Sequence, residues 1–143
     1  MLMLLRGRRT PEKYSRIISP ERVSKLLKNN GRRKIVFITR NPDEKPGKNV
    51  SFLWISSIEH PKAINPRKLH VIEQKVWDEL NRENAVVVID GLEYLLLENG
   101  PETTLRFVGK LRDMAILTNS NIYIVVSEAI DEKIRNLLRR IVE

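Results

Sequence analysis

The chain has 143 residues, of which 41% are hydrophobic and 31% charged, and it contains no cysteine. This length and composition are typical of one globular domain with a real core, and they exclude a disordered chain, a disulfide framework and a thiolate metal site. Lysine and arginine outnumber aspartate and glutamate by 26 to 18, so the net charge is +8, which suits nucleic acid, an anionic membrane or an acidic protein as a partner.

The N-terminal residues predict an arm and not a membrane segment. Met1 to Leu5 is apolar, but it is far too short to span a bilayer and lacks the apolar core and cleavage site of a signal peptide. We therefore expect a cytoplasmic protein without an integral membrane segment. A basic arm at residues 1–13 would precede a single domain at residues 14–143.

Apolar runs predict the strands. The clearest run, Ala85 to Ile89, has five apolar residues without alternation, which is typical of a strand covered on both faces. Asp90-Gly91 ends this run as a turn pair. The five predicted strands cover residues 14–18, 34–39, 50–56, 85–90 and 121–126.

Capping residues and apolar stripes predict the helices between these strands. Ser19-Pro20-Glu21 opens the first helix and Gly31 ends it. Residues 57–64 form a connector, after which Asn65-Pro66 caps a long helix whose apolar stripe runs to Leu80. The other predicted helical segments cover residues 92–97, residues 101–117 and the stretch that follows residues 127–131.

Strands that alternate mostly with helices predict an α/β fold. We expect a doubly wound, mostly parallel sheet of about five strands, with right-handed crossovers that place helices on both faces. In such sheets, ligands bind at the carboxyl ends of the strands. The polar residues at or just past the predicted strand ends, here called the rim, are Thr39, Arg40, Asn41, Ser56, Asp90, Glu93 and Ser127.

Asp90 stands where phosphate-binding ATPases keep the acid that holds Mg²⁺, so a nucleotide enzyme has to be considered. The pairs Gly47-Lys48 and Gly109-Lys110 lack both the earlier glycine and the following serine or threonine of a phosphate loop. In the turn after the first strand, Pro20 removes an N–H donor and Glu21 adds a negative charge. We therefore expect no enzyme and no cofactor.

Two features of the rim are open to two interpretations each. Asp90 and Glu93 are either a relict acid pair that faces a crevice, or a turn residue and a helix-terminus residue with structural roles. Arg40 either anchors a partner through bidentate bonds to a carboxylate, or closes an internal ion pair with Asp90 or Glu93.

Metal binding is not expected, because His60 and His70 stand ten residues apart without a neighbouring acidic cluster. Gln74 is the only glutamine, and abundant charge with little glutamine and no cysteine is a pattern of thermophiles.

A strand-end rim combined with a disabled phosphate turn predicts a non-catalytic interaction or regulatory module that binds a protein partner or a second copy of itself. The alternative is a basic nucleic-acid-binding protein, although the basic residues are spread out and are not interleaved with aromatics. A hydrolase using Asp90 and Glu93 would lack a nucleophile and a metal ligand. The arginines that would contact nucleic acid are Arg6, Arg8, Arg9, Arg32 and Arg33.

A series of short runs resembles the archaeal family known as domain of unknown function 835, over roughly Tyr14 to the C terminus. The resemblance implies a RecA-like α/β fold, related to circadian-clock-type ATPases that have lost the phosphate loop, with no assigned activity and a regulatory or interaction role. The loop at residues 43–50 is short and lacks the longer helical stretch that the family pattern has at this place. The matching runs are Ile38–Lys45, Leu53–Ser56, Ile64–Pro66, Val88–Leu95, Asn99-Gly100 and Leu111–Asp113.

Overall fold

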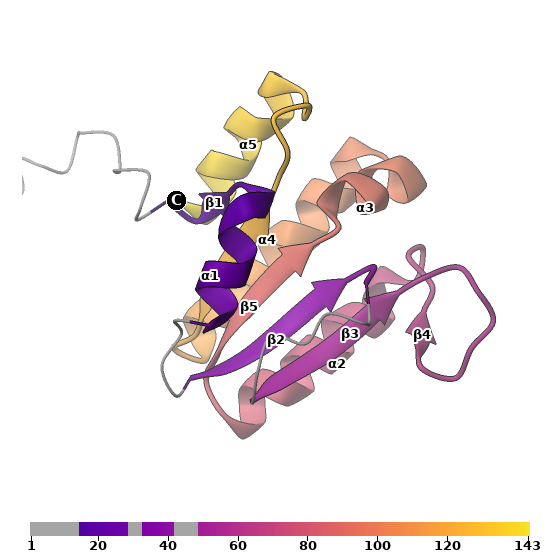
Figure 1. Cartoon of the computed structure of the whole chain (residues 1–143), viewed down its shortest axis with the longest axis vertical. Coiled ribbons are helices and arrows are strands. Elements are labelled where there is room, and N and C mark those ends of the chain that lie inside the picture. The colour runs from indigo at the N-terminus through magenta and orange to yellow at the C-terminus, as the bar shows by residue number, and fades with distance from the viewer. Residues whose placement is uncertain (1–14, 29–32, 42–48) are drawn as a thin grey trace, which may run out of the picture.

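A computed structural model describes residues 15–28, 33–41 and 49–143 (Figure 1). The predicted basic arm at residues 1–13 and most of the loop at residues 43–50 lie outside the described residues. Within the described part, no helix is both long enough and apolar enough to cross a membrane.

The described strands form one sheet in which every neighbouring pair is parallel, in the order β1-β6-β5-β2-β3-β4. The sheet has six strands, one more than the sequence predicts, because residues 63–64 of the expected connector pair with the end of β3. The strands are β1 (Ile17–Ile18), β2 (Lys34–Thr39), β3 (Val50–Ile55), β4 (Ala63–Ile64), β5 (Ala85–Asp90) and β6 (Asn121–Val125).

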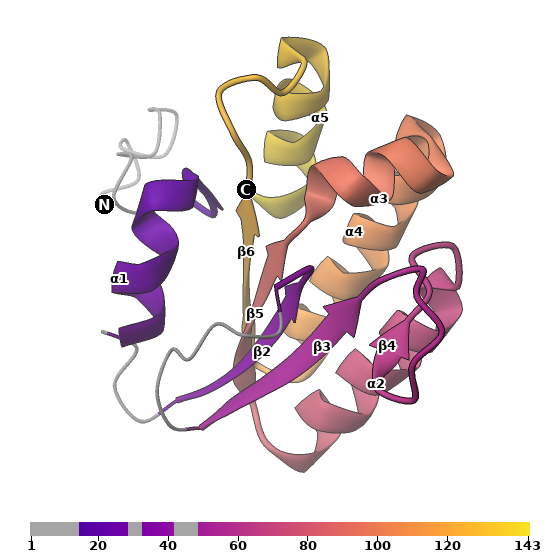
Figure 2. The same ribbon diagram turned by 45° about the vertical axis from the view of Figure 1, so that its right-hand side comes forward.

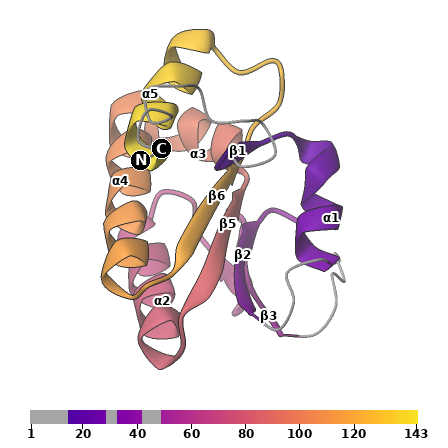
Figure 3. The same cartoon turned by 90° about the vertical axis from the view of Figure 1, so that its left-hand side faces the viewer.

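Helices cover both faces of the sheet, but unequally. Figure 3 shows α2, α3, α4 and α5 on one face and α1 on the other. The doubly wound arrangement predicted from the sequence is therefore confirmed. The helical segments are η3 (Pro20–Arg22), α1 (Val23–Lys28), α2 (Leu69–Arg82), α3 (Leu92–Asn99), α4 (Pro101–Leu117) and α5 (Glu132–Val142).

Two apolar clusters fill the space on either side of the sheet. The larger one joins alternate strand residues such as Val36, Val87 and Ile122 to the inner faces of α2 to α5. The smaller one packs Phe37, Val88 and their neighbours against α1. Alternate residues of the same strands enter opposite clusters, which explains why β2 and β5 have continuous apolar runs.

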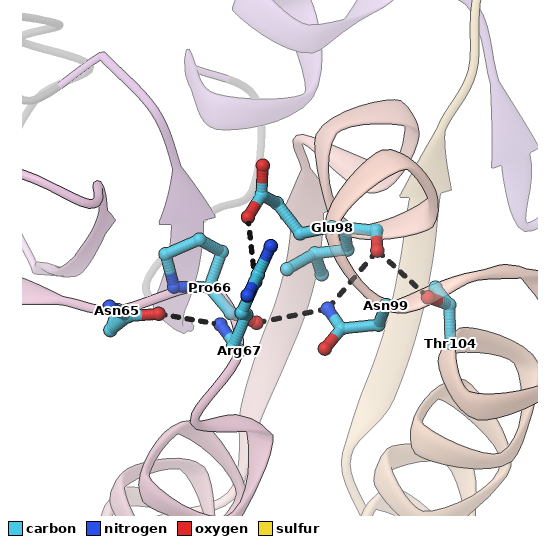
Figure 4. Close-up of polar contacts among 7 residues, drawn as sticks. Asn65, Pro66, Arg67, Glu98, Asn99 and Thr104 are labelled. Atoms are coloured by element: carbon cyan, nitrogen blue, oxygen red, sulfur yellow. Dashed lines mark hydrogen bonds and ion pairs between the residues drawn. The ribbon is translucent and has the colours of Figure 1, made fainter.

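The long helix expected from Asn65-Pro66 begins later, at Leu69. Asn65 uses its side-chain oxygen to accept the backbone N–H of Arg67 at 2.8 Å, which makes a turn and not a helix cap. Asn99 then donates to the carbonyls of Pro66 and Leu95 at 3.0 and 3.1 Å, as Figure 4 shows.

The same cluster joins three elements. The fully buried Thr104 of α4 also donates to the carbonyl of Leu95, at 3.0 Å, and Arg67 pairs with Glu98 at 3.2 Å (Figure 4). The Asn65-Pro66 and Asn99-Gly100 runs therefore lock the start of α2 to the α3–α4 junction.

Candidate functional site

The centre of the rim is formed by the ends of two neighbouring strands. β2 and β5 pair so that Thr39 lies opposite Asp90. Thr39 is 1% exposed, and its hydroxyl donates to Oδ2 of Asp90 at 3.1 Å and accepts the backbone N–H of Asn41 at 3.0 Å. One buried hydroxyl therefore ties the two strand ends together and fixes the first turn after β2.

Gly91 makes the connection from β5 to α3 possible. Its φ of 148° lies in a region that residues with a side chain rarely adopt. A Cβ at this position would also contact Cγ of Arg40 and Cδ1 of Ile55, each at 3.6 Å. Because the chain turns within this one residue, Glu93 and Tyr94 lie in the first turn of α3, immediately after the end of β5.

Arg40 lies over the ring of Tyr94. Its guanidinium carbon is 3.7 Å from the ring centroid, which is a cation–π contact. The internal ion pair that the sequence left open does not form, since no carboxylate of the described residues lies within 4.0 Å of the Arg40 guanidinium. Arg40 remains exposed to solvent.

Glu93 and Ser127 form a second bonded pair on the rim. Oε2 of Glu93 accepts the backbone N–H of Ser127 at 2.9 Å, and the carbonyl of Ser127 accepts Nη2 of Arg135 at 3.0 Å. Asp90 and Glu93 thus each accept a hydrogen bond from within the fold, although the donor to Asp90 is the Thr39 hydroxyl and not a backbone N–H of its own turn. The Thr39–Asp90 contact joins the ends of β2 and β5, and the Glu93–Ser127 contact joins α3 to the residues after β6.

Ser56 stands apart from the other rim residues. Its hydroxyl accepts the backbone N–H of Ile58 at 3.2 Å, and it makes no hydrogen bond to the remaining six within the described ranges. It lines a hollow of about 760 Å³ at the β4 edge of the sheet, where His60 packs against Trp54. The structure thus groups Thr39, Arg40, Asn41 and Asp90, pairs Glu93 with Ser127, and separates Ser56.

The arginines proposed for nucleic acid are described only in part. Arg6, Arg8, Arg9 and Arg32 lie outside the described residues. Arg33 precedes β2, and its Nη2 donates to the carbonyl of Ala85 at 3.5 Å, at the start of β5. This places Arg33 at the opposite end of the strands from the rim.

In residues 15–28, 33–41 and 49–143, no group of three or more His, Cys, Asp or Glu side chains is placed so that it could hold a metal ion. Nδ1 of His60 accepts the backbone N–H of Lys62 at 3.0 Å, so this imidazole caps a turn. The rim instead presents an exposed guanidinium on an aromatic face beside the exposed Asn41.

Two contributors to the rim, Tyr94 and Arg135, were not predicted. The apolar stretch at residues 92–97 favours a core position for Tyr94; its half-buried side chain does pack against the larger cluster, and its ring also carries Arg40. The available signal was its place in the first turn of the helix that follows the strand-end Asp90. Arg135 follows the helix cap Asp131 by four residues, and only the folded loop brings it to Ser127.

Comparison with known proteins adds one finding. No curated protein matches the chain. A family model described as a protein of unknown function (DUF835) matches residues 14–142, and this range includes every run quoted above for the resemblance. The chain therefore belongs to this family of proteins of unknown function.

Proposed function

We propose that the chain is a non-catalytic, RecA-like protein-interaction or regulatory module that binds a partner at its strand-end rim. The observation that carries this proposal is the division of roles on the rim. Asp90 and Glu93 accept hydrogen bonds from Thr39 and from the Ser127 backbone, whereas the exposed guanidinium of Arg40 rests on Tyr94. A guanidinium pre-positioned on an aromatic ring is well suited to bind a carboxylate of another protein.

The turn after β1 supports the absence of nucleotide chemistry. The backbone carbonyl of Ser19 accepts the backbone N–H of Arg22 at 3.1 Å, so Pro20 to Arg22 form a short 3₁₀ turn. Pro20 has no N–H, and one of the N–H groups that a phosphate cradle would need is used inside this turn. β6 lies between β1 and β5 in the sheet. The Pro20–Arg22 turn after β1 and Asp90 at the end of β5 therefore lie on opposite sides of the end of β6.

Calorimetry tests the nucleotide part of the proposal. Titration with ATP and Mg²⁺ should give no saturable heat at millimolar concentration. Micromolar binding, or ATP turnover that the Asp90→Ala variant abolishes, would refute the non-catalytic assignment.

Substitution of Arg40 tests the rim. Wild-type protein, Arg40→Ala, Arg40→Lys and the exposed control Arg139→Ala would each be used to capture partners from a lysate of the source cell. We expect the wild type and Arg139→Ala to retain the same partner and Arg40→Ala to lose it, with Arg40→Lys intermediate because a lysine cannot make bidentate bonds. Equal capture by all four folded proteins would mean that the rim is not the binding surface.

A second candidate, favoured by the net charge of +8, is a basic nucleic-acid-binding protein. Binding driven by phosphate contacts weakens steeply with salt, because bound counterions are released. A gel-shift series from low to physiological salt with double- and single-stranded DNA and RNA tests this candidate. The absence of a shift at low salt would eliminate this candidate.

For the interaction module proposed first, we also propose a cytoplasmic location and an archaeal, thermophilic source.

A further inference from the structure

One edge of the sheet is only half covered. β4 has two residues and pairs with Trp54 and Ile55 alone, although β3 has six residues. Figure 2 shows β4 beside only the C-terminal end of β3. Residues 50–53 of β3 therefore have no strand on their outer side in the described part of the chain.

The hydrogen bonds at the two ends of β3 show which backbone groups point outward. The backbone N–H of Ser56 points toward β4 and donates to the carbonyl of Ile64 at 3.0 Å. The carbonyl of Asn49 points toward β2 and accepts the backbone N–H of Ile35 at 3.0 Å. Because backbone groups alternate sides along a strand, the N–H and C=O groups of Val50 and Phe52 face away from β2. No described residue pairs with these four groups, and such an edge is a template for another strand.

The hollow of about 760 Å³ lies along this edge. Its floor includes Leu53 and one side of α2, where Val71 stands between Lys68 and Lys75. Lys68 immediately precedes α2, Val71 and Lys75 are spaced i and i+4 on the helix, and all three line the hollow. Both lysines are exposed, and neither has a carboxylate partner within 4.0 Å among the described residues.

The loop at residues 56–62, which also lines the hollow, does not cancel the positive charge of Lys68 and Lys75. Glu59 and Lys62 both line the hollow, so the loop adds one charge of each sign. The positive character therefore comes from Lys68 and Lys75, which flank an apolar floor. We call the outer backbone of residues 50–53, together with Lys68, Val71 and Lys75, the open edge.

We propose that the open edge binds an extended acidic segment of a partner protein, which adds to the sheet as a strand beside β3. Alternate side chains of a strand point to opposite faces, so acidic residues would lie over α2 and apolar residues beside Phe52. From the N-cap Lys68 to Lys75 the chain advances about 10 Å along the α2 axis, within reach of acidic side chains about 7 Å apart at alternate strand positions.

A second copy of the chain fits this surface less well. Two open edges facing each other would bring Lys68 and Lys75 close to the same lysines of the other copy, and like charges oppose such pairing. The open edge also lies apart from the Arg40 contact with Tyr94. The inference therefore goes beyond the proposed function and does not depend on it.

Labelled peptides test the proposal directly. The first probe is a pool of fluorescein-labelled eight-residue peptides with glutamate at every second position and valine, isoleucine, threonine or tyrosine between. The matched pool carries lysine in place of glutamate. In anisotropy titrations up to 1 mM peptide, we expect saturable binding of the glutamate pool, at least tenfold tighter than that of the lysine pool.

Backbone methylation of the probe tests strand addition. In an added strand, only alternate N–H groups face β3. Methylating the nitrogens of one alternating set should weaken binding at least tenfold, whereas methylating the other set should leave it within about twofold. Binding that ignores which set is methylated would overturn strand addition.

Charge reversal of the protein supplies the matched control. The Lys68→Glu/Lys75→Glu variant should invert the preference between the two pools, whereas Lys133→Glu/Arg139→Glu, with the same change in net charge, should keep it. Arg40→Ala should leave peptide binding unchanged, which separates this surface from the rim.

Three results would overturn the proposal. They are no saturable binding of the glutamate pool at 1 mM, equal binding of the two pools, and an unchanged preference in Lys68→Glu/Lys75→Glu protein that melts like the wild type. Sedimentation of the free protein tests self-association through the open edge. A wild-type dimer that the Lys68→Glu/Lys75→Glu variant dissociates would assign the open edge to a second copy of the chain instead.

Discussion

Replacing Thr39 with valine removes one buried hydroxyl with almost no change in shape. The hydroxyl donates to Asp90 and accepts from the Asn41 backbone. Asn41 is exposed, so its N–H can bond to water after the substitution, whereas Asp90 is half-buried and loses a donor. A hydrogen bond to a charged group contributes about 1.5–3 kcal/mol. We therefore expect Thr39→Val to lower the free energy of unfolding by about 2 kcal/mol.

Urea unfolding followed by circular dichroism measures this change as a lower midpoint with an unchanged m-value. Thr39→Ser, which keeps the hydroxyl, should lower the free energy of unfolding by less than Thr39→Val does. In an Asp90→Ala background, Thr39→Val should cost at least about 1 kcal/mol less than in the wild type, since contacting residues couple. A Thr39→Val loss below about 0.5 kcal/mol, or full additivity with Asp90→Ala, would refute the assigned role of the hydroxyl.

Three further substitutions test local features by the same unfolding assay. Gly109→Ala should stabilise α4 by about 0.5–1 kcal/mol, because a Cβ there would meet nothing within 4 Å; a loss would mean that the site is crowded. Gly91→Ala should destabilise by about 1 kcal/mol or more because its φ is 148°, and an unchanged midpoint would contradict the strain. Asp131→Ala should cost about 1 kcal/mol, since its carboxylate accepts the N–H groups of Lys133 and Ile134, whereas Asp131→Asn should cost less.

The main strands could be predicted because burial on both faces leaves a pattern in the sequence. β2 and β5 consist almost entirely of buried apolar residues, which few other structures require. β4 could not be predicted, because Ala63 and Ile64 become a strand only by pairing with Trp54 and Ile55. A two-residue strand has no period of its own.

The start of α2 and the packing of α5 show a similar limit. Asn65-Pro66 has the composition of a helix cap, but its turn is held by Asn99, a residue distant in the sequence. On α5, an apolar stripe predicts that both Leu137 and Leu138 face inward; Leu138 is fully buried, whereas Leu137 is 37% exposed. The helix meets the core along a narrower line than its stripe suggests.

The rim residues could be predicted as a set, because strand ends follow from the strand boundaries. Their partners could not, because partners depend on strand order. Thr39 reaches Asp90 only because β2 and β5 are neighbours, although residues 40–84 separate the two strands in the sequence. Glu93 likewise reaches Ser127 only because β6 lies next to β5.

Both proposed surfaces offer positive charge next to groups that a peptide can use. Arg40 stands on an aromatic ring, and Lys68 and Lys75 line the hollow beside backbone groups of β3 that no described residue pairs with, while Asp90 and Glu93 accept bonds within the fold. Nucleic acid would require cations that follow a phosphate backbone along one continuous face. Separate cations, each beside an aromatic ring or an open strand edge, instead match carboxylates carried on a folded or extended protein chain. Among the described residues, the placement of Arg40, Lys68 and Lys75 fits the acidic protein partner that we propose.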